Sequence, residues 1–181
     1  MKTFSLKTYL HWLTDRHILC MNRRNARYIA LANPRQHYHV VDHKILTKRI
    51  AHDAGVPVPT TYAVVSRMGE IARIVPEVTR AHRTLVIKPN GGAAGRGVLV
   101  LERDDQEVWR RANGQPVSFL DMRYHLSSIL SGLYSLSELQ DHAIIEQRIF
   151  PHQFFNNITW HGTPDIRIIL YRSVPVMAMV R

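Results

Sequence analysis

A glycine-rich segment, Gly91–Gly97 (GGAAGRG), separates two apolar runs that are predicted β-strands, Thr84–Lys88 and Val98–Leu101. Four of its seven residues are glycines, which allow positive φ and let backbone N–H groups approach a phosphate closely. Walker and Rossmann loops lead from a strand into a helix, whereas this loop joins strand to strand. The segment therefore predicts a phosphate-binding loop between two strands, and a flexible hairpin without a ligand is the alternative.

Charged residues that suit a nucleotide accompany this loop along the chain. Lys88 stands three residues before Gly91, where its ammonium can meet a phosphate oxygen as a mobile point charge. Lys44 lies near the start of a predicted helix. In Ile144–Ile149 (IIEQRI), a strand with a polar pair after two aliphatic residues can offer backbone groups and the Glu146 carboxylate to an adenine edge. The alternatives are a surface lysine at position 88 and an edge-strand charge at position 146.

The rest of the chain predicts helices and strands that follow one another. Predicted helices cover 3–19, a segment from the N-cap Asp42 through Ala54 that Gly55 ends, Met68–Arg80 with an interruption near Pro76, and Phe119–Leu130 capped by Ser118. A basic connector is predicted at Asn22–Arg27. Further strands are predicted at Thr60–Ser66, Val108–Arg111, Ala143–Ile149, Asp165–Tyr171 and Val174–Arg181.

This pattern is typical of an α+β fold with antiparallel strand pairs in two small lobes. We expect residues 1–40 to form an N-terminal helical segment with the basic connector. Residues 41–142 are expected to form a first lobe with the glycine loop, and residues 143–181 the start of a second lobe.

The net charge of +10 comes from the N-terminal half of the chain. Residues 1–90 hold 15 Lys and Arg against 5 Asp and Glu, whereas residues 91–181 hold 9 of each kind. A basic half can bind nucleic acid or an acidic membrane surface. It can equally line a site for a polyanionic small ligand or form a solvated face. Nucleic acid is disfavoured, because no nucleic-acid motif accompanies the charge and the basic residues do not alternate with aromatic ones.

Cys20 is the only cysteine, so an intrachain disulfide and a cysteine-rich zinc site are excluded. No run of about 18 apolar residues occurs, which excludes a transmembrane helix. The N-terminus lacks a small-residue cleavage site and makes a poor signal peptide. Among the 11 histidines, His37, His39 and His43 lie near one another without an Asp, Glu or Cys set, so no metal ligand is assigned. We expect a cytoplasmic protein without membrane insertion.

Four segments in this order resemble the ATP-grasp superfamily: DHK…AGVPVP, LVIKPNGGAAGRGV, IIEQRI and PDIRIILYRSVPVMAMVR. The similarity covers about residues 40–181. The last segment is similar to the Asp-x-Arg strand pair of the ribosomal-protein glutamate ligase and glutathione synthetase branch. The whole chain looks closest to the α-L-glutamate ligase-related proteins. The resemblance implies an ATP-grasp fold, in which two small α+β lobes hold a nucleotide between them.

The resemblance also implies roles for individual residues. Its ATP-binding positions match Lys44 and Lys88 at the phosphates, Gly91, Gly92, Gly95 and Gly97 in the loop that closes over them, Glu146, Gln147, Arg148 and Ile149 at the adenine, and Gln153 near the ribose. Its arginines beside the transferred phosphate match Arg167 and Arg181. Fixed cations and N–H donors stabilise the negative charge of phosphoryl transfer, so no protein nucleophile is required.

The implied activity is that of an ATP-dependent carboxylate–amine ligase, in which an amine attacks an acyl phosphate, with glutamate as a candidate substrate. Mg²⁺ ligands are expected downstream of Arg181. The chain stops inside an apolar strand, so we expect a C-terminally truncated protein with little or no activity. His43 stands where relatives carry an aspartate. An ATP-grasp protein of surface-sugar modification, and a basic nucleic-acid- or anion-binding module without catalysis, remain alternatives. The acyl donor, the amine acceptor and the oligomeric state stay open.

Overall fold

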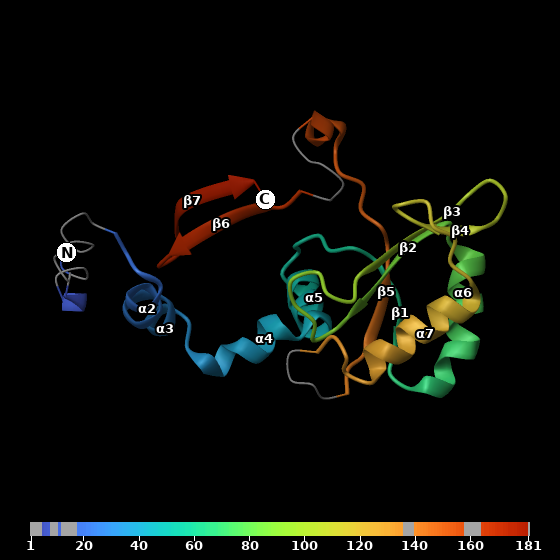
Figure 1. Ribbon diagram of the computed structural model, residues 1–181, viewed down its shortest axis with the longest axis horizontal. Coiled ribbons are helices and arrows are strands. Elements are labelled where there is room, and N and C mark those ends of the chain that lie inside the picture. The colour runs from blue at the N-terminus through green and yellow to red at the C-terminus, as the bar shows by residue number, and fades with distance from the viewer. Residues whose placement is uncertain (1–4, 8–10, 12–17, 136–139, 158–163, 181) are drawn as a thin grey trace. The chain divides into compact units, whose positions relative to one another are not determined.

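The computed structural model describes residues 5–7, 11, 18–135, 140–157 and 164–180 (Figure 1). The chain divides into two compact units. One unit spans His39–Thr163, and the other combines Met1–Tyr38 with Pro164–Arg181. The mixture of helices with antiparallel strands confirms the predicted α+β class. Within the described residues, no helix has the length and apolar character needed to cross a membrane.

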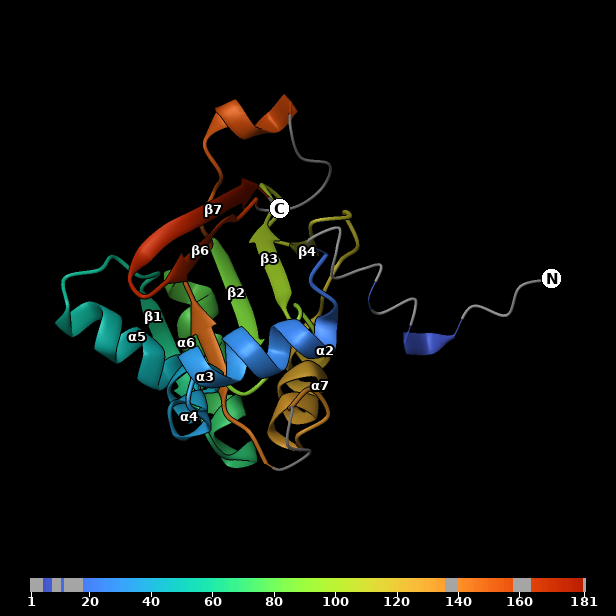
Figure 2. The ribbon, with the colours of Figure 1, turned by 90° about the vertical axis from the view of Figure 1, so that its left-hand side faces the viewer.

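A five-stranded sheet forms the centre of the unit 39–163. In spatial order its strands are β1 (Thr61–Val65), β5 (Ala143–Glu146), β2 (Thr84–Pro89), β3 (Leu99–Arg103) and β4 (Trp109–Arg111) (Figure 2). Every neighbouring pair is antiparallel. Each strand overlaps a segment for which the sequence predicts a strand. β5 is an interior strand, so it belongs to the same compact unit as β2 although the predicted division at residue 142 separates them.

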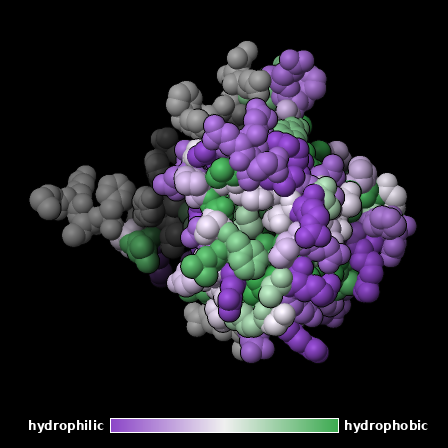
Figure 3. All heavy atoms as spheres, turned by 90° about the vertical axis from the view of Figure 1, so that its right-hand side faces the viewer, coloured by the Kyte–Doolittle hydropathy of each residue, from purple (hydrophilic) through white to green (hydrophobic). Residues whose placement is uncertain are grey.

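Two helices, α6 (Ile71–Ala81) and α7 (Phe119–Leu130), cover one face of this sheet (Figure 1). Their apolar side chains pack with the inward-facing residues of the strands into a single core. Along β2, buried Leu85 and Ile87 enter this core, while Val86 and Lys88 alternate with them. Viewed from the side of α6 and α7, the surface is polar around a smaller apolar area (Figure 3).

The helix α6 differs from its prediction, because it runs unbroken through Pro76 after the short 3₁₀-helix η3 (Met68–Glu70). A proline inside a helix removes one backbone hydrogen bond and costs about 3 kcal/mol. The apolar face of α6 offsets this cost by burial in the core. The buried residues of that face are Ile71, Ile74, Val75 and Val78. Ser118 caps α7 as predicted, since its side chain accepts from a backbone N–H of the first turn.

The helix α5 (Lys44–Asp53) lies on the opposite face of the sheet from α6 and α7 (Figure 1). Its predicted N-cap is wrong, because Asp42 is the last residue of the preceding helix α4 (Tyr38–Asp42). His43 takes the cap position, with Nδ1 accepting from a backbone N–H three residues on at 3.2 Å. Gly55 lies just beyond the end of the helix, as predicted, with a φ of +72° that glycine adopts without strain.

The N-terminal part of the second unit is helical where the sequence predicts a connector. The predicted basic connector at Asn22–Arg27 is therefore wrong, and the arginine and alanine residues of this segment are good helix formers. The helices here are α2 (Met21–Arg24), the π-helix η1 (Asn25–Ile29), α3 (Ala30–Ala32) and η2 (Arg35–His37). The predicted helix at 3–19 lies mostly outside the described residues.

The C-terminal part of this unit is a hairpin of β6 (Ile166–Tyr171) and β7 (Val174–Val180). Both strands were predicted, together with the turn at Arg172 and Ser173. The two turn residues have φ of +49° and +66°, which suits the twist of a two-residue hairpin loop. Every residue of both strands is exposed.

Candidate functional site

The face of the sheet that α6 and α7 do not cover combines apolar and charged side chains. Val86 and Lys88 of β2 point to this face, because they alternate with residues of the core. Val86 pairs with Glu146 of β5 on one side and with Val100 of β3 on the other. Lys88 pairs with Ile144 of β5. An apolar strip and a lysine therefore lie in line, beside the end of β5.

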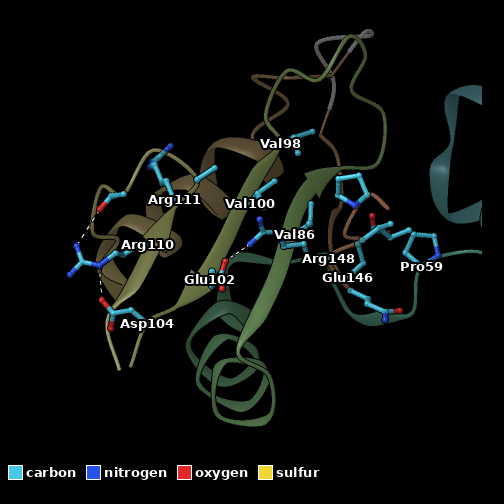
Figure 4. A pocket seen from close by; sticks show the side chains of 15 residues that line it. Pro59, Val86, Val98, Val100, Glu102, Asp104, Arg110, Arg111, Glu146 and Arg148 are labelled. Carbon is cyan, nitrogen blue, oxygen red and sulfur yellow. Dashed lines mark hydrogen bonds and ion pairs between the residues drawn. The ribbon is translucent and has the colours of Figure 1, made fainter. Parts of the chain in front are cut away.

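A cavity of about 840 Å³ opens over the apolar strip (Figure 4), which is a usual size for a small-molecule site. Val86 and Val100 line it from the sheet, and residues 146–149 line it where β5 ends. Arg110 and Arg111 of β4 lie at the end opposite Glu146 in the figure. The cavity thus has an apolar floor that the segment after β5 borders, a combination that suits a planar heterocycle.

Two lysines share the carboxylate of Glu146, of which only 6% of the side chain is exposed. Lys88 Nζ contacts Oε1, and Lys48 Nζ lies 2.7 Å from Oε2. Lys48 also donates to Thr61 Oγ1 at 2.6 Å. A buried carboxylate is costly unless it is paired, and here it is paired twice. The cluster of two ammonium groups and one carboxylate carries a net positive charge.

A third lysine, Lys44 at the start of α5, extends this positive region to the glycine loop. Its Nζ donates to the backbone oxygen of Asn90 at 3.0 Å and to that of Gly92. Burial lowers the pKa of Lys44, nearby Lys88 lowers it further, and Asp141 and Asp42 oppose the shift. Both the burial of Lys44 and the neighbouring Lys88 ammonium therefore disfavour positive charge at Lys44.

The glycine loop is held firmly where it leaves β2. Asp141, which is only 7% exposed, accepts from the backbone N–H of Gly91 with both carboxylate oxygens, at 3.1 and 2.8 Å. Asn90, directly before the loop, is 4% exposed. Gly92 forms an antiparallel bridge with Ser135. These contacts fix the backbone of the first two loop residues.

The other end of the loop is held by α7 and the segment after it. The backbone oxygen of Gly97 lies 3.0 Å from His125 Nε2. Burial lowers the pKa of His125, the hydrogen bond to Gly97 opposes this, and Arg111 lowers it further. Gly97 has a φ of +74°, and a Cβ there would lie 2.6 Å from Cγ of Tyr134. Gly95, at φ +73°, has open space instead. Only the four residues between Gly92 and Gly97 lack such anchors among the contacts described.

The segment after β5 differs from its prediction as a strand through Ile149. Pairing stops at Glu146, and Pro151 cannot donate to a continued strand ladder. Gln147 N–H donates to Thr60 oxygen at 2.8 Å. Arg148 reaches across the cavity edge to Glu102, with 2.5 Å between Nη1 and Oε2. Residues 147–149 therefore form a loop along the cavity.

The structure brings most of the predicted ATP-binding residues together within the unit 39–163. Three other predicted residues lie away from the cavity lining, in the other unit or outside the described residues. Gln153 is exposed at the start of the 3₁₀-helix η4 (Gln153–Asn157) and is not among the residues that line the cavity. Arg167 lies on β6 in the other unit, 3.9 Å from Asp165. Arg181 is outside the described residues. The roles predicted for these three residues remain predictions.

The carboxylates of the site do not fit a Mg²⁺ ion. Glu146 is paired with two lysines, and Asp141 accepts from backbone N–H groups. No group of three or more His, Cys, Asp or Glu side chains suited to a metal occurs within the described ranges. Carboxylate oxygens that already accept from cations or N–H groups are poor Mg²⁺ ligands.

An antiparallel sheet with a glycine loop, two lysines beside it and a cavity at the end of β5 has the features of an ATP-grasp protein. The model of the family described as sugar-transfer associated ATP-grasp matches residues 23–181. The chain therefore belongs to this family, whose fold binds ATP, typically with Mg²⁺, and generally serves ATP-dependent ligation. No curated protein and no solved structure gives a significant match.

Several residues of the site were not predicted from the sequence. Lys48 could have been found, because it stands four residues after Lys44 and so lies on the same face of the helix. Asp141 and His125 carry no such signal, since each reaches the loop from a distant part of the chain. Only the folded sheet brings them to Gly91 and Gly97.

Proposed function

We propose that the chain binds ATP on the face of the sheet opposite α6 and α7, with adenine over Val86 and Val100 and the phosphates at Lys88, Lys44 and the glycine loop. The main observation in support of this proposal is the alternation of side chains along β2. It places Val86 and Lys88 on one face, about 7 Å apart along the strand. The apolar floor of the cavity therefore leads directly to a lysine and then to the loop.

The charges of the site support a polyanionic ligand. Burial and, after it, the nearby Lys88 ammonium lower the pKa of Lys44, so positive charge at Lys44 is disfavoured. A bound phosphate placed between the two lysines relieves their repulsion. Backbone N–H groups of the glycine loop add donors that need no side chain. Residues 147–149 line the cavity, and we propose that their backbone groups meet the edge of the adenine ring, except for the Gln147 N–H, which donates to the backbone oxygen of Thr60.

The adenine preference separates a nucleotide site from a general anion site. We expect ATP to saturate one site in isothermal titration calorimetry, and GTP to bind at least about tenfold more weakly, because residues 147–149 offer a fixed set of backbone donors and acceptors. Raising the salt concentration should weaken ATP binding only moderately. Equal affinity for ATP and GTP with a steep salt dependence would instead support the basic anion-binding module.

For the reaction, we propose that ATP activates a carboxylate as an acyl phosphate, which an amine or a related nucleophile then attacks. The description of the family favours a sugar-linked substrate. Glutamate is the second candidate, favoured by the Asp165-x-Arg167 pattern that resembles the glutamate ligases.

Hydroxylamine traps acyl phosphates as hydroxamates, which provides a test of this reaction. With ATP and hydroxylamine present, we expect a sugar acid such as glucuronate to yield hydroxamate faster than glutamate does. A reaction without carboxylate measures the background. Faster reaction with glutamate would reverse the order of the two candidates, and hydroxamate from neither would contradict catalysis of this step with these donors.

A further inference from the structure

Lys48 has no role in the ATP site proposed above, yet it is paired with Glu146. The Lys48 side chain is 15% exposed, and its Nζ lies 2.7 Å from Glu146 Oε2. Thr61 Oγ1, on β1, accepts a second hydrogen bond from the same ammonium at 2.6 Å. Two of its three N–H donors are thus already used within the protein. Lys48 is therefore poorly placed to bind a phosphate itself.

Lys88 is in the opposite situation. It contacts the other oxygen of Glu146, and it stands on the strand that leads into the glycine loop. If a phosphate of ATP takes the Lys88 ammonium, Glu146 loses one of its two cationic partners. An unpaired carboxylate on a side chain as buried as that of Glu146 is strongly disfavoured. The exchange of partners is therefore favourable only if another cation stays with Glu146.

We propose that Lys48 is the positioning residue that keeps Glu146 paired while Lys88 turns to the phosphates of ATP. This inference rests on the proposed ATP site. Glu146 then remains in place at the end of β5, and residues 147–149 keep the backbone geometry that faces the adenine. Lys48 acts through Glu146 and does not touch the nucleotide.

The position of α5 supports this role, because the helix that carries Lys48 is tied to the start of the glycine loop. Asn90 Oδ1 accepts from Ile45 N–H at 3.0 Å, and Asn90 oxygen accepts from Lys44 Nζ at 3.0 Å. Asn90 N–H in turn donates to the backbone oxygen of His142 at 2.9 Å. These hydrogen bonds of Asn90 thereby connect the helix that carries Lys48 with the end of β2 and the start of β5.

The first test compares two charge-removing variants of the same helix. Lys48→Met is expected to weaken ATP binding about tenfold, the loss that follows from one charge-assisted hydrogen bond. Arg49→Met removes the same charge from the neighbouring, exposed position and should change the affinity less than twofold. Lys48→Arg, which keeps the charge, should stay within about threefold of the unchanged protein. An affinity for Lys48→Met within twofold of the unchanged protein would overturn the proposal.

A double-mutant cycle then asks whether Lys48 acts through Glu146. In a Glu146→Gln background the side chain is neutral and needs no cation, so adding Lys48→Met should change ATP affinity less than twofold. A tenfold loss in both backgrounds would show that Lys48 acts independently of Glu146 and would contradict the proposal. Circular dichroism and thermal melting establish that each variant is folded. Lys48→Gln, which keeps a donor for Thr61, replaces Lys48→Met in both tests if the latter does not fold.

The two proposals fail in different ways. If the unchanged protein does not bind ATP, the proposed function is wrong. If it binds ATP and the Lys48 variants bind equally well, the ATP site stands and only the role of Lys48 is wrong.

Discussion

Replacing Lys88 with methionine is expected to weaken ATP binding about a hundredfold, which corresponds to about 2.7 kcal/mol. Two effects add in this variant. The phosphates lose a cation that lies next to the glycine loop, and a charge-assisted hydrogen bond of this kind contributes about 1.5–3 kcal/mol. Glu146 is then left with one cationic partner instead of two. The positive charge of the site is therefore smaller, and an anion binds less favourably. Calorimetric titration with ATP measures the change.

A matched control for this variant is Arg123→Met on α7. It removes one positive charge with the same replacement residue, but Arg123 is exposed on the helix that covers the other face of the sheet. We expect a change in ATP affinity of less than about twofold, because exposed charges at a distance are screened by salt. If Lys88→Met and Arg123→Met weakened binding equally, Lys88 would have only a general electrostatic effect and no place at the phosphates.

Replacing Gly97 with alanine is expected to lower the free energy of unfolding by about 3 kcal/mol. A residue with a Cβ at φ +74° costs about 1–2 kcal/mol. The new Cβ would also lie 2.6 Å from Cγ of Tyr134, and Tyr134 packs against the core. Forcing extra volume into a packed region costs about 1–3 kcal/mol. Urea denaturation followed by circular dichroism measures the sum.

Gly95→Ala separates these two causes. Gly95 has almost the same φ, +73°, but a Cβ there meets no atom within 4 Å. The free energy of unfolding of Gly95→Ala should therefore fall only by the cost of the positive φ, about 1–2 kcal/mol. Equal losses in the two variants would show that Tyr134 yields to a Cβ at position 97 without cost. In that case Tyr134 would not anchor the end of the loop.

The elements of the fold that could be predicted are those with a local signal. The alternation of Leu85, Val86, Ile87 and Lys88 identifies β2, and Gly55 marks the end of α5. Local signals failed where tertiary packing decides the outcome. Pro76 is tolerated because the buried face of α6 outweighs one lost hydrogen bond. The choice of His43 over Asp42 as N-cap depends on where α4 ends, which no residue type marks.

The site divides in the same way. Lys44, Lys88 and the glycine loop could be predicted because each is contained in a short segment. The partners of Glu146 could not, since β1, β2, β5 and α5 must assemble before Lys48 and Lys88 reach one carboxylate. Asp141 appeared in no prediction for the same reason, as its contact with Gly91 joins residues fifty positions apart.

The anchors of the glycine loop determine how much order ATP must impose on it. Fixing one residue of a flexible backbone costs about 1–2 kcal/mol of entropy at room temperature. Asp141 and Ser135 already restrain Gly91 and Gly92, and His125 and Tyr134 restrain Gly97. Residues 93–96, within which Arg96 N–H donates to the backbone oxygen of Ala93 in a turn, are the part of the loop without such anchors to the rest of the fold. Folding has thus already removed about 3–6 kcal/mol of the entropy that a fully free loop would lose on binding.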